Sequence, residues 1–205
     1  MILRDYLHEI QLPNIPIESM GEISCAFIKK DICTLWDAVE HIHKLPYGRT
    51  SSRENYFQVL NESRGACSTK HALLAGLAEE MMVPLKLVFG LFILNAKNTP
   101  RLLPILECHQ LEGIPEAHCY LRYQNSYLDI TFPESTEFSV DLSFEEEIYI
   151  SPQQIGLFKI ERHKQFIEYW IKNKPNIQLN SVWNAREQWI QKLSESNINK
   201  VKNND

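Results

Sequence analysis

The sequence has little that would support a cross-linked, metal-binding or membrane-spanning chain. Five cysteines occur among 205 residues, an odd number with irregular spacing and no Cys-x-x-Cys pair. This pattern argues against a disulfide scaffold and against a zinc finger, and we predict neither a bound metal nor another cofactor. The longest apolar run, 83–94, is interrupted by Lys86 and Gly90 and is shorter than the ~20 residues of a membrane helix.

The chain also lacks an excess of positive charge. Lysine and arginine number 21 against 26 aspartates and glutamates, which gives a net charge of -5. Surfaces that bind nucleic acid neutralise many phosphates and are basic, so we expect no nucleic acid partner. The segment 1–16 places Arg4, Asp5 and Glu9 among its apolar residues and so lacks the apolar centre of a signal peptide. Free thiols and this start predict a cytoplasmic protein that does not associate with membranes.

What remains is an ordinary globular composition. Hydrophobic residues make up 44% of the chain, charged residues 23% and aromatic residues 10%, values that exclude a disordered or fibrous chain. Folding at this length buries roughly 70% of the surface of the unfolded chain, enough for one substantial core. We therefore predict a single domain over 1–196, followed by a polar, non-periodic tail at 197–205 that is expected to be disordered.

The first third of the chain is predicted to be mostly helical. A 3.6-residue apolar period predicts one helix over 32–42, and a serine cap predicts a short helix that ends at Leu60. The segment 67–82 is rich in Ala, Leu, Glu and Met and predicts the strongest helix of the chain, which Pro84 ends.

The middle of the chain changes to strands. Alternating apolar residues predict a strand at 85–93, and the segments 117–123 and 127–131 predict an antiparallel hairpin around a short turn. The stretch 95–115 contains three prolines and is long for a structureless loop. It is expected to be functional, to be partly ordered, or to hide a strand near 102–106.

The last third is predicted to contain one strand followed by helices. The strand is expected at 147–150, and two amphipathic helices are expected at 159–173 and 181–194. Helices first, then antiparallel strands, then helices again indicate the α+β class.

Cys67 is the cysteine whose predicted position favours chemistry. It opens the helix predicted for 67–82, where unpaired N–H groups and the helix dipole stabilise negative charge. A thiol there ionises more readily, and the thiolate is the nucleophile. Arg64 and Lys70 are expected to lower the pKa of this thiol, to bind an acidic substrate group, or simply to be solvated. The ordinary alternative for such a cysteine is a small buried apolar residue.

His118 and Asp129 are the predicted partners of this thiol. If the hairpin turn is centred on 124–125, the two residues form a diagonal pair on one face of the sheet. A carboxylate can then orient an imidazole that activates a thiol, although a local hydrogen bond and a turn position are the ordinary alternatives. His71 lies on the same helix face as Cys67 and is either an alternative base or a packing residue beside the site.

Two segments resemble motifs of the transglutaminase-like superfamily. GACSTKHALLAGLAEEMMVPLKLVFG resembles its nucleophile segment, with a glycine, one residue, the cysteine, a Leu/Ala-rich helix and an entering strand. HCYLRYQNSYLDITFP resembles its histidine-led strand, turn and strand ending in Asp-x-Thr, and LPYG resembles a segment that precedes the cysteine. The resemblance covers about 45–133. It departs from the family at Arg122, where many members have an acidic residue.

The resemblance implies a papain-like fold in which the nucleophile helix packs on an antiparallel sheet, with extra N- and C-terminal helices here. It also implies roles for single residues: Cys67 is the nucleophile, His118 the base and Asp129 the residue that orients the base.

The function expected from this reasoning is thiol-dependent acyl transfer at an amide or ester carbonyl. Protease, amidase or deamidase, and transglutaminase chemistry all fit, with a protein, a peptide or a small amide as substrate. Tyr47, Asn55 and Tyr56 are candidates for an oxyanion donor beside the Cys67 N–H. Two alternatives stay open: a non-catalytic module that binds a protein partner, and an acyltransferase that uses a thioester donor.

Overall fold

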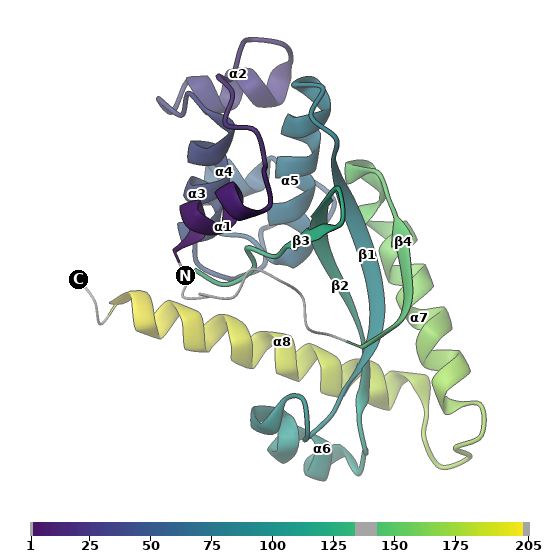
Figure 1. Ribbon diagram of the computed structural model, residues 1–205. Coiled ribbons are helices and arrows are strands. Elements are labelled where there is room, and N and C mark those ends of the chain that lie inside the picture. Colours follow the sequence, from purple (N-terminus) through teal and green to yellow (C-terminus); the bar gives the residue numbers. More distant parts are fainter. Residues whose placement is uncertain (1, 134–142, 203–205) are drawn as a thin grey trace.

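The protein is α+β, as predicted. The computed structural model describes residues 2–133 and 143–202, with side chains through residue 195, and combines helices with a four-stranded antiparallel sheet (Figure 1). The helices are α1 (Leu3–Glu9), α2 (Glu22–Ile28), α3 (Leu35–Lys44), α4 (Gln58–Glu62), α5 (Cys67–Glu80), α6 (Leu103–His109), α7 (Leu157–Ile171) and α8 (Leu179–Lys202). The strands are β1 (Leu85–Leu94), β2 (Ile114–Tyr123), β3 (Ser126–Leu128) and β4 (Phe144–Tyr149), and the short 3-10 helices are η1 (Pro100–Leu102) and η2 (Pro152–Ile155).

The predicted helices correspond to α3, α4, α5, α7 and α8, with bounds that differ by a few residues. Helices α1 and α2 were not predicted. Helix α8 continues to Lys202 and so includes most of the segment 197–205 that we predicted to be a disordered tail. Neither glycine nor proline interrupts the chain between 179 and 202, so nothing in its backbone chemistry stops the helix earlier.

The sheet has the strand order β3-β2-β1-β4. Strands β1 and β2 pair along their whole lengths, from Leu85 opposite Tyr123 to Leu94 opposite Ile114. Strand β4 pairs with the other side of β1 and contains residues 147–149 of the strand predicted at 147–150. Strand β3 pairs only with the last residues of β2, so among the described residues no strand lies beside the first half of β2 on that edge.

The predicted turn and its register are confirmed, but the second strand is Ser126–Leu128 rather than the predicted 127–131. Leu121 pairs with Leu128, and Tyr123 with Ser126, which is the register of a turn centred on 124–125. Strand β3 ends at Leu128. Beyond it the Ile130 N–H donates to His71 Nε2 and the Thr131 N–H to the Asp129 carboxylate, each at 2.9 Å, so side chains take the place of a β ladder there.

The strand expected near 102–106 is wrong, because this segment forms η1 and α6. Leu102, Ile105 and Leu106 are buried at the spacing of one helix face. Pro104 sits in the first turn of α6, where its missing N–H costs no helical hydrogen bond. The other expectation for 95–115, a partly ordered stretch, fits this arrangement.

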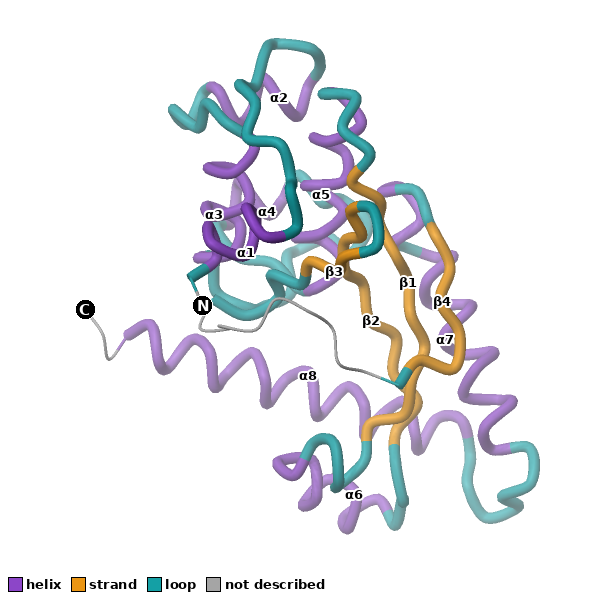
Figure 2. Tube along the Cα trace, viewed as in Figure 1, coloured by secondary structure: helices purple, strands orange, loops and turns teal. Residues whose placement is uncertain are grey.

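Helix α5 lies in the larger apolar core and is buried around its circumference. Its residues from Ala72 to Ala78 are buried, and it contacts α2, α3, β1 and β2 (Figure 2). At Gly76 the side chain of Ile23 approaches so closely that an added Cβ would lie 2.6 Å from its Cδ1. Because α5 is enclosed on all sides, its first residue, Cys67, has a fixed position relative to β2.

A second apolar cluster connects the ends of β1 and β2 to α6, α7 and α8. Its buried members include Leu106, Ile114, Ile167 and Trp189. In Figure 1, α8 crosses below the group formed by α1 to α5, and it contacts β2, α6 and α7. This packing brings α8 to the site described next. No helix in the described part of the chain has both the length and the apolar character needed to cross a membrane.

Candidate active site

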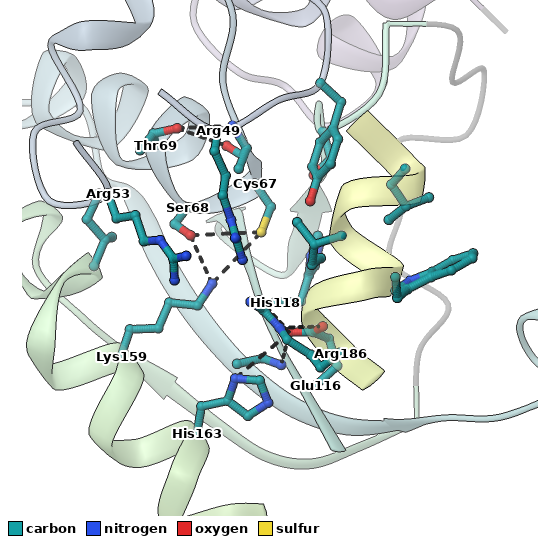
Figure 3. A pocket seen from close by; sticks show the side chains of 18 of the residues that line it. Arg49, Arg53, Cys67, Ser68, Thr69, Glu116, His118, Lys159, His163 and Arg186 are labelled. Atoms are coloured by element: carbon teal, nitrogen blue, oxygen red, sulfur yellow. Dashed lines mark hydrogen bonds and ion pairs between the residues drawn. The ribbon is translucent and has the colours of Figure 1, made fainter. Parts of the chain in front are cut away.

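A cavity of about 450 Å³ lies where the first residues of α5 meet β2, α7 and α8 (Figure 3). Cys67, His118 and Asp129 all line it. The residues that the sequence singles out for a triad, which lie up to 62 positions apart, are therefore brought to one place. The described wall of the cavity also contains Tyr47, but it contains neither Asn55 nor Tyr56.

The turn before α5 places Cys67, which is half-buried, at the start of a largely buried helix. The Thr69 hydroxyl accepts a hydrogen bond from the Ala66 N–H at 3.1 Å and caps the first turn. Gly65 is needed for space, because a Cβ there would lie 2.8 Å from a carbon of Lys70. The first N–H groups of α5 have no helical acceptor and are available to stabilise negative charge beside the thiol.

His118 and Asp129 form the hydrogen bond that the hairpin register predicts. The His118 Nε2 lies 2.7 Å from Asp129 Oδ2, and both side chains are mostly buried. The other carboxylate oxygen accepts hydrogen bonds from the Thr131 N–H at 2.9 Å and the Thr131 hydroxyl at 2.5 Å. These contacts fix the carboxylate, which in turn fixes the plane and the tautomer of the imidazole.

The Cys67 thiol and the His118 imidazole change each other's protonation. Because Asp129 occupies Nε2, Nδ1 is the ring nitrogen left for the thiol. Burial alone raises the pKa of the Cys67 thiol, but Lys159 and His118 outweigh burial and lower this pKa to about 6. Burial alone lowers the pKa of His118, but Asp129 and Cys67 raise it well above its usual value. At neutral pH the pair is a thiolate beside an imidazolium.

Lys159 is a residue of the candidate site that the sequence analysis did not predict. Its ammonium, from the first turn of α7, lies 2.9 Å from the Ser68 hydroxyl, 3.9 Å from the Cys67 sulfur and 3.6 Å from the Cys119 sulfur (Figure 3). The side chain is buried. No local pattern identifies this lysine, because its partners lie 40 to 92 positions away in the sequence.

The two cations that the sequence placed near the thiol have other partners. Arg64, which is exposed, pairs with the half-buried carboxylate of Glu62 at 2.8 Å and does not appear among the described residues that line the cavity. Lys70 is completely buried, and its ammonium donates to the carbonyl oxygens of three residues at distances between 2.6 and 3.4 Å. These residues are His43, Leu45 and Thr131.

His71 has the geometry of the packing residue rather than that of the alternative base. Its Nδ1 lies 2.8 Å from the Cys67 carbonyl oxygen, and its Nε2 accepts a hydrogen bond from the Ile130 N–H at 2.9 Å. Burial lowers the pKa of His71 to about 4, so the ring is neutral. With both nitrogens occupied, His71 connects the first turn of α5 to the segment that carries Asp129.

Of the three candidate oxyanion donors, only Tyr47 reaches the cavity. Its side chain is almost fully buried and packs on Phe132 with ring centroids 5.1 Å apart. Burial and the nearby Cys67 thiolate raise the pKa of the Tyr47 hydroxyl, so the hydroxyl stays protonated and can donate. Asn55 instead accepts a hydrogen bond from the Phe57 N–H at 3.0 Å, and Tyr56 stacks on the Phe57 ring.

A network of ion pairs forms one wall of the cavity. Arg186 of α8 binds Glu116 of β2 at 3.0 to 3.1 Å and also binds Glu187 at 2.9 Å. Glu187 accepts two further hydrogen bonds from Arg49, at 2.6 and 2.9 Å, and lies 3.4 Å from Arg53. Burial alone raises the pKa of Glu116, but Arg186 outweighs it and lowers this pKa to about 2. The network holds α8 against the site.

Another part of the cavity wall is apolar. It is formed by side chains of β1 and α8, namely Phe92, Leu94, Trp189, Ile190 and Leu193. The cavity therefore combines the Cys67 thiol with charged groups and with a surface suited to an apolar group. No group of three or more His, Cys, Asp and Glu side chains in the described part of the chain is arranged to hold a metal ion.

Comparisons of this chain with models of protein families, with curated proteins and with solved structures find no match. What the site can do is therefore argued from its own chemistry. A thiolate, an imidazolium that can give up a proton and an oriented carboxylate are the groups required for nucleophilic attack on a carbonyl carbon.

Proposed function

We propose that the protein is a thiol-dependent acyl-transfer enzyme with a papain-like, transglutaminase-like core. The observation that carries the proposal is the 2.7 Å contact between His118 and Asp129 beside Cys67, the first residue of α5. The nucleophile comes from the start of a buried helix, and the histidine and the aspartate come from a hairpin. This is the arrangement that the resemblance to the transglutaminase-like superfamily implies.

The first half of the reaction forms a thioester. The Cys67 thiolate attacks the carbonyl carbon, so that a C–S bond forms and the carbonyl oxygen becomes an oxyanion. The Cys67 N–H and the Tyr47 hydroxyl are placed to stabilise this oxyanion. His118 then transfers its proton to the leaving nitrogen as the C–N bond breaks. The products are a free amine and an acyl group on Cys67.

The second half returns the enzyme to its starting state. The neutral His118 imidazole takes a proton from water, and the resulting hydroxide attacks the thioester carbon. The C–S bond breaks, the acyl group leaves as a carboxylic acid, and Cys67 is again a thiolate beside an imidazolium. We propose hydrolysis rather than crosslinking because water, which is small enough to enter a cavity of this size, can accept the acyl group.

The experiment that tests this proposal is the rate at which iodoacetamide alkylates each cysteine between about pH 5 and 8. We expect Cys67 to react fastest near the acid end of this range, and His118→Ala to slow its alkylation. Cys33 and Cys108, which are both exposed, are internal references. A non-catalytic binding module predicts instead that Cys67 reacts no faster than these references and that the His118→Ala variant behaves as the unmodified protein does.

A further inference from the structure

The cavity carries one positive charge more than its described residues neutralise. The positive groups that line it are Arg49, Arg53, Lys159, Arg186 and the His118 imidazolium, and the negative groups are Glu116, Asp129 and the Cys67 thiolate, together with Glu187, which lies outside the lining and pairs with the three arginines. The excess is the same after acylation, because the thiolate charge and the imidazolium proton are lost together. A ligand with one negative charge would neutralise this excess positive charge at every stage of the reaction.

Of the arginines among these cations, Arg53 makes the longest ion pair within the protein. Its one ion pair with a described residue is a 3.4 Å contact with Glu187, whose two oxygens already accept shorter hydrogen bonds from Arg49 and Arg186. The Arg53 side chain is 46% exposed and points into the cavity (Figure 3). Most of its N–H donors are therefore available to a ligand.

Lys159 supplies the second cation and fixes where the negative charge of a ligand must lie. Its ammonium touches a hydroxyl and two sulfurs, and no carboxylate among the described residues lies within ion-pair distance of it. Because the ammonium lies 3.9 Å from the Cys67 sulfur, an anion bound to Lys159 is adjacent to the carbonyl under attack. In an amide of an α-amino acid, the carboxylate carbon is about 4.3 Å along the bonds from that carbonyl carbon.

We propose that this site cleaves amides whose leaving group is an α-amino acid with a free carboxylate, and that Arg53 and Lys159 bind this carboxylate. The proposal rests on the acyl-transfer function proposed above and adds the class of substrate. The acyl group lies against the apolar wall. When the C–N bond breaks, the amino acid leaves with the proton from His118 on its nitrogen. Small N-acyl amino acids and the C-terminal bond of a peptide share this chemistry.

The anion subsite can be tested without turnover by comparing iodoacetate with iodoacetamide. Both reagents alkylate thiols, but only iodoacetate carries a carboxylate. We expect the ratio of their rate constants at Cys67 to exceed the ratio at exposed Cys33 about tenfold, because a hydrogen bond between charged groups contributes about 1.5–3 kcal/mol. A ratio at Cys67 equal to or below that at Cys33 would overturn the subsite.

Two variants make the test specific to Arg53. In Arg53→Gln the iodoacetate preference at Cys67 should fall at least threefold. Arg64→Gln is a matched control, because Arg64 is 44% exposed, pairs with Glu62 and lies outside the described lining of the cavity. It should keep the full preference. Equal losses in the two variants would contradict a bound carboxylate and indicate a general effect of surface charge.

The substrate assignment is tested with three probes that share one acyl group. The first is an N-acyl amino acid, the second is its carboxamide, and the third is a short peptide that ends in the same residue with a free carboxylate. We expect faster hydrolysis of the two acids than of the carboxamide. The relative rates of the two acids show whether the preferred substrate is a small N-acyl amino acid or the C-terminal bond of a peptide. Hydrolysis without a carboxylate preference overturns this inference alone. An iodoacetate preference without any hydrolysis overturns the proposed function and the substrate class, and leaves only the anion subsite.

Discussion

Replacing Lys159 by methionine removes the ammonium that lies 3.9 Å from the Cys67 sulfur while keeping a side chain of similar length. Lys159 is the largest of the influences that lower the pKa of the Cys67 thiol. At 3.9 Å, and with an effective dielectric constant of about 20, two unit charges attract each other by about 4 kcal/mol. This energy corresponds to a pKa that is higher by about three in the variant.

The assay for this prediction is the pH dependence of the alkylation of Cys67, followed by mass spectrometry of its peptide. In the unmodified protein the rate should rise through a midpoint near 6, where the thiol ionises. In Lys159→Met the midpoint should move upward by about three pH units, with His118 still providing part of the activation.

Two control variants separate charge from packing. Lys159→Arg keeps a positive charge beside the sulfur and should keep a low midpoint. Lys164→Met makes the same substitution at an exposed position of α7 and should leave the midpoint unchanged. A midpoint in folded Lys159→Met that lies within half a pH unit of the unmodified protein would refute the assignment of this lysine as a partner of the thiolate.

Three further predictions concern the groups around the thiol. Asp129→Asn should slow the acylation of Cys67 by an activated ester by on the order of 10³–10⁴-fold, because His118 loses the charge that stabilises its protonated form. The acylation rate is measured by stopped flow, and an unchanged melting temperature shows that the variant is folded. Lys70→Met removes the buried ammonium that donates to three carbonyl oxygens and should lower the free energy of unfolding by about 3 kcal/mol, measured in urea. Glu116 has a pKa lowered from 4.5 to about 2, so its contribution of about 3 kcal/mol is present above pH 4.5 and is lost as the pH falls toward 2. In Glu116→Gln the unfolding free energy should lose this part of its pH dependence, and an unchanged pH profile would contradict the pairing with Arg186.

The part of the site that was predictable from the sequence is the part encoded by short stretches of chain. The position of Cys67 at the start of the strongest helix can be predicted from the residues next to it in the sequence. His118 and Asp129 are eleven positions apart, and the turn between them fixes their register, so their contact follows from local geometry. The same reasoning gave α5 and β1 with bounds close to those observed, and the hairpin with its observed register.

The part that was not predictable depends on contacts between distant segments. Lys159 is 92 positions from Cys67, and Arg49 is 138 positions from Glu187. Each of these residues belongs to an ordinary helix or loop pattern, in which a charged side chain usually faces solvent. Their burial results from the packing of α7 and α8 on β2, which no local period reveals.

The strand expected near 102–106 shows a different failure. A short apolar run between prolines is compatible with a strand or with one turn of helix, and local periodicity does not distinguish them. Packing against α8 stabilises the helical conformation of this segment, which forms α6. Asn55 and Tyr56 were also predicted as candidate oxyanion donors, but in the turn before α4 the Asn55 side chain accepts a hydrogen bond from the Phe57 N–H.

The central claim is that Cys67 forms a covalent acyl intermediate with the help of His118. The most direct measurement is the mass of the protein after brief reaction with an activated ester at about pH 6, where an ordinary thiol is almost entirely protonated. The account predicts one acyl group per chain, located on the peptide that contains Cys67, and no such adduct in His118→Ala. Acyl groups spread over Cys33 and Cys108, or an adduct on Cys67 that forms as fast in the variant, would contradict it.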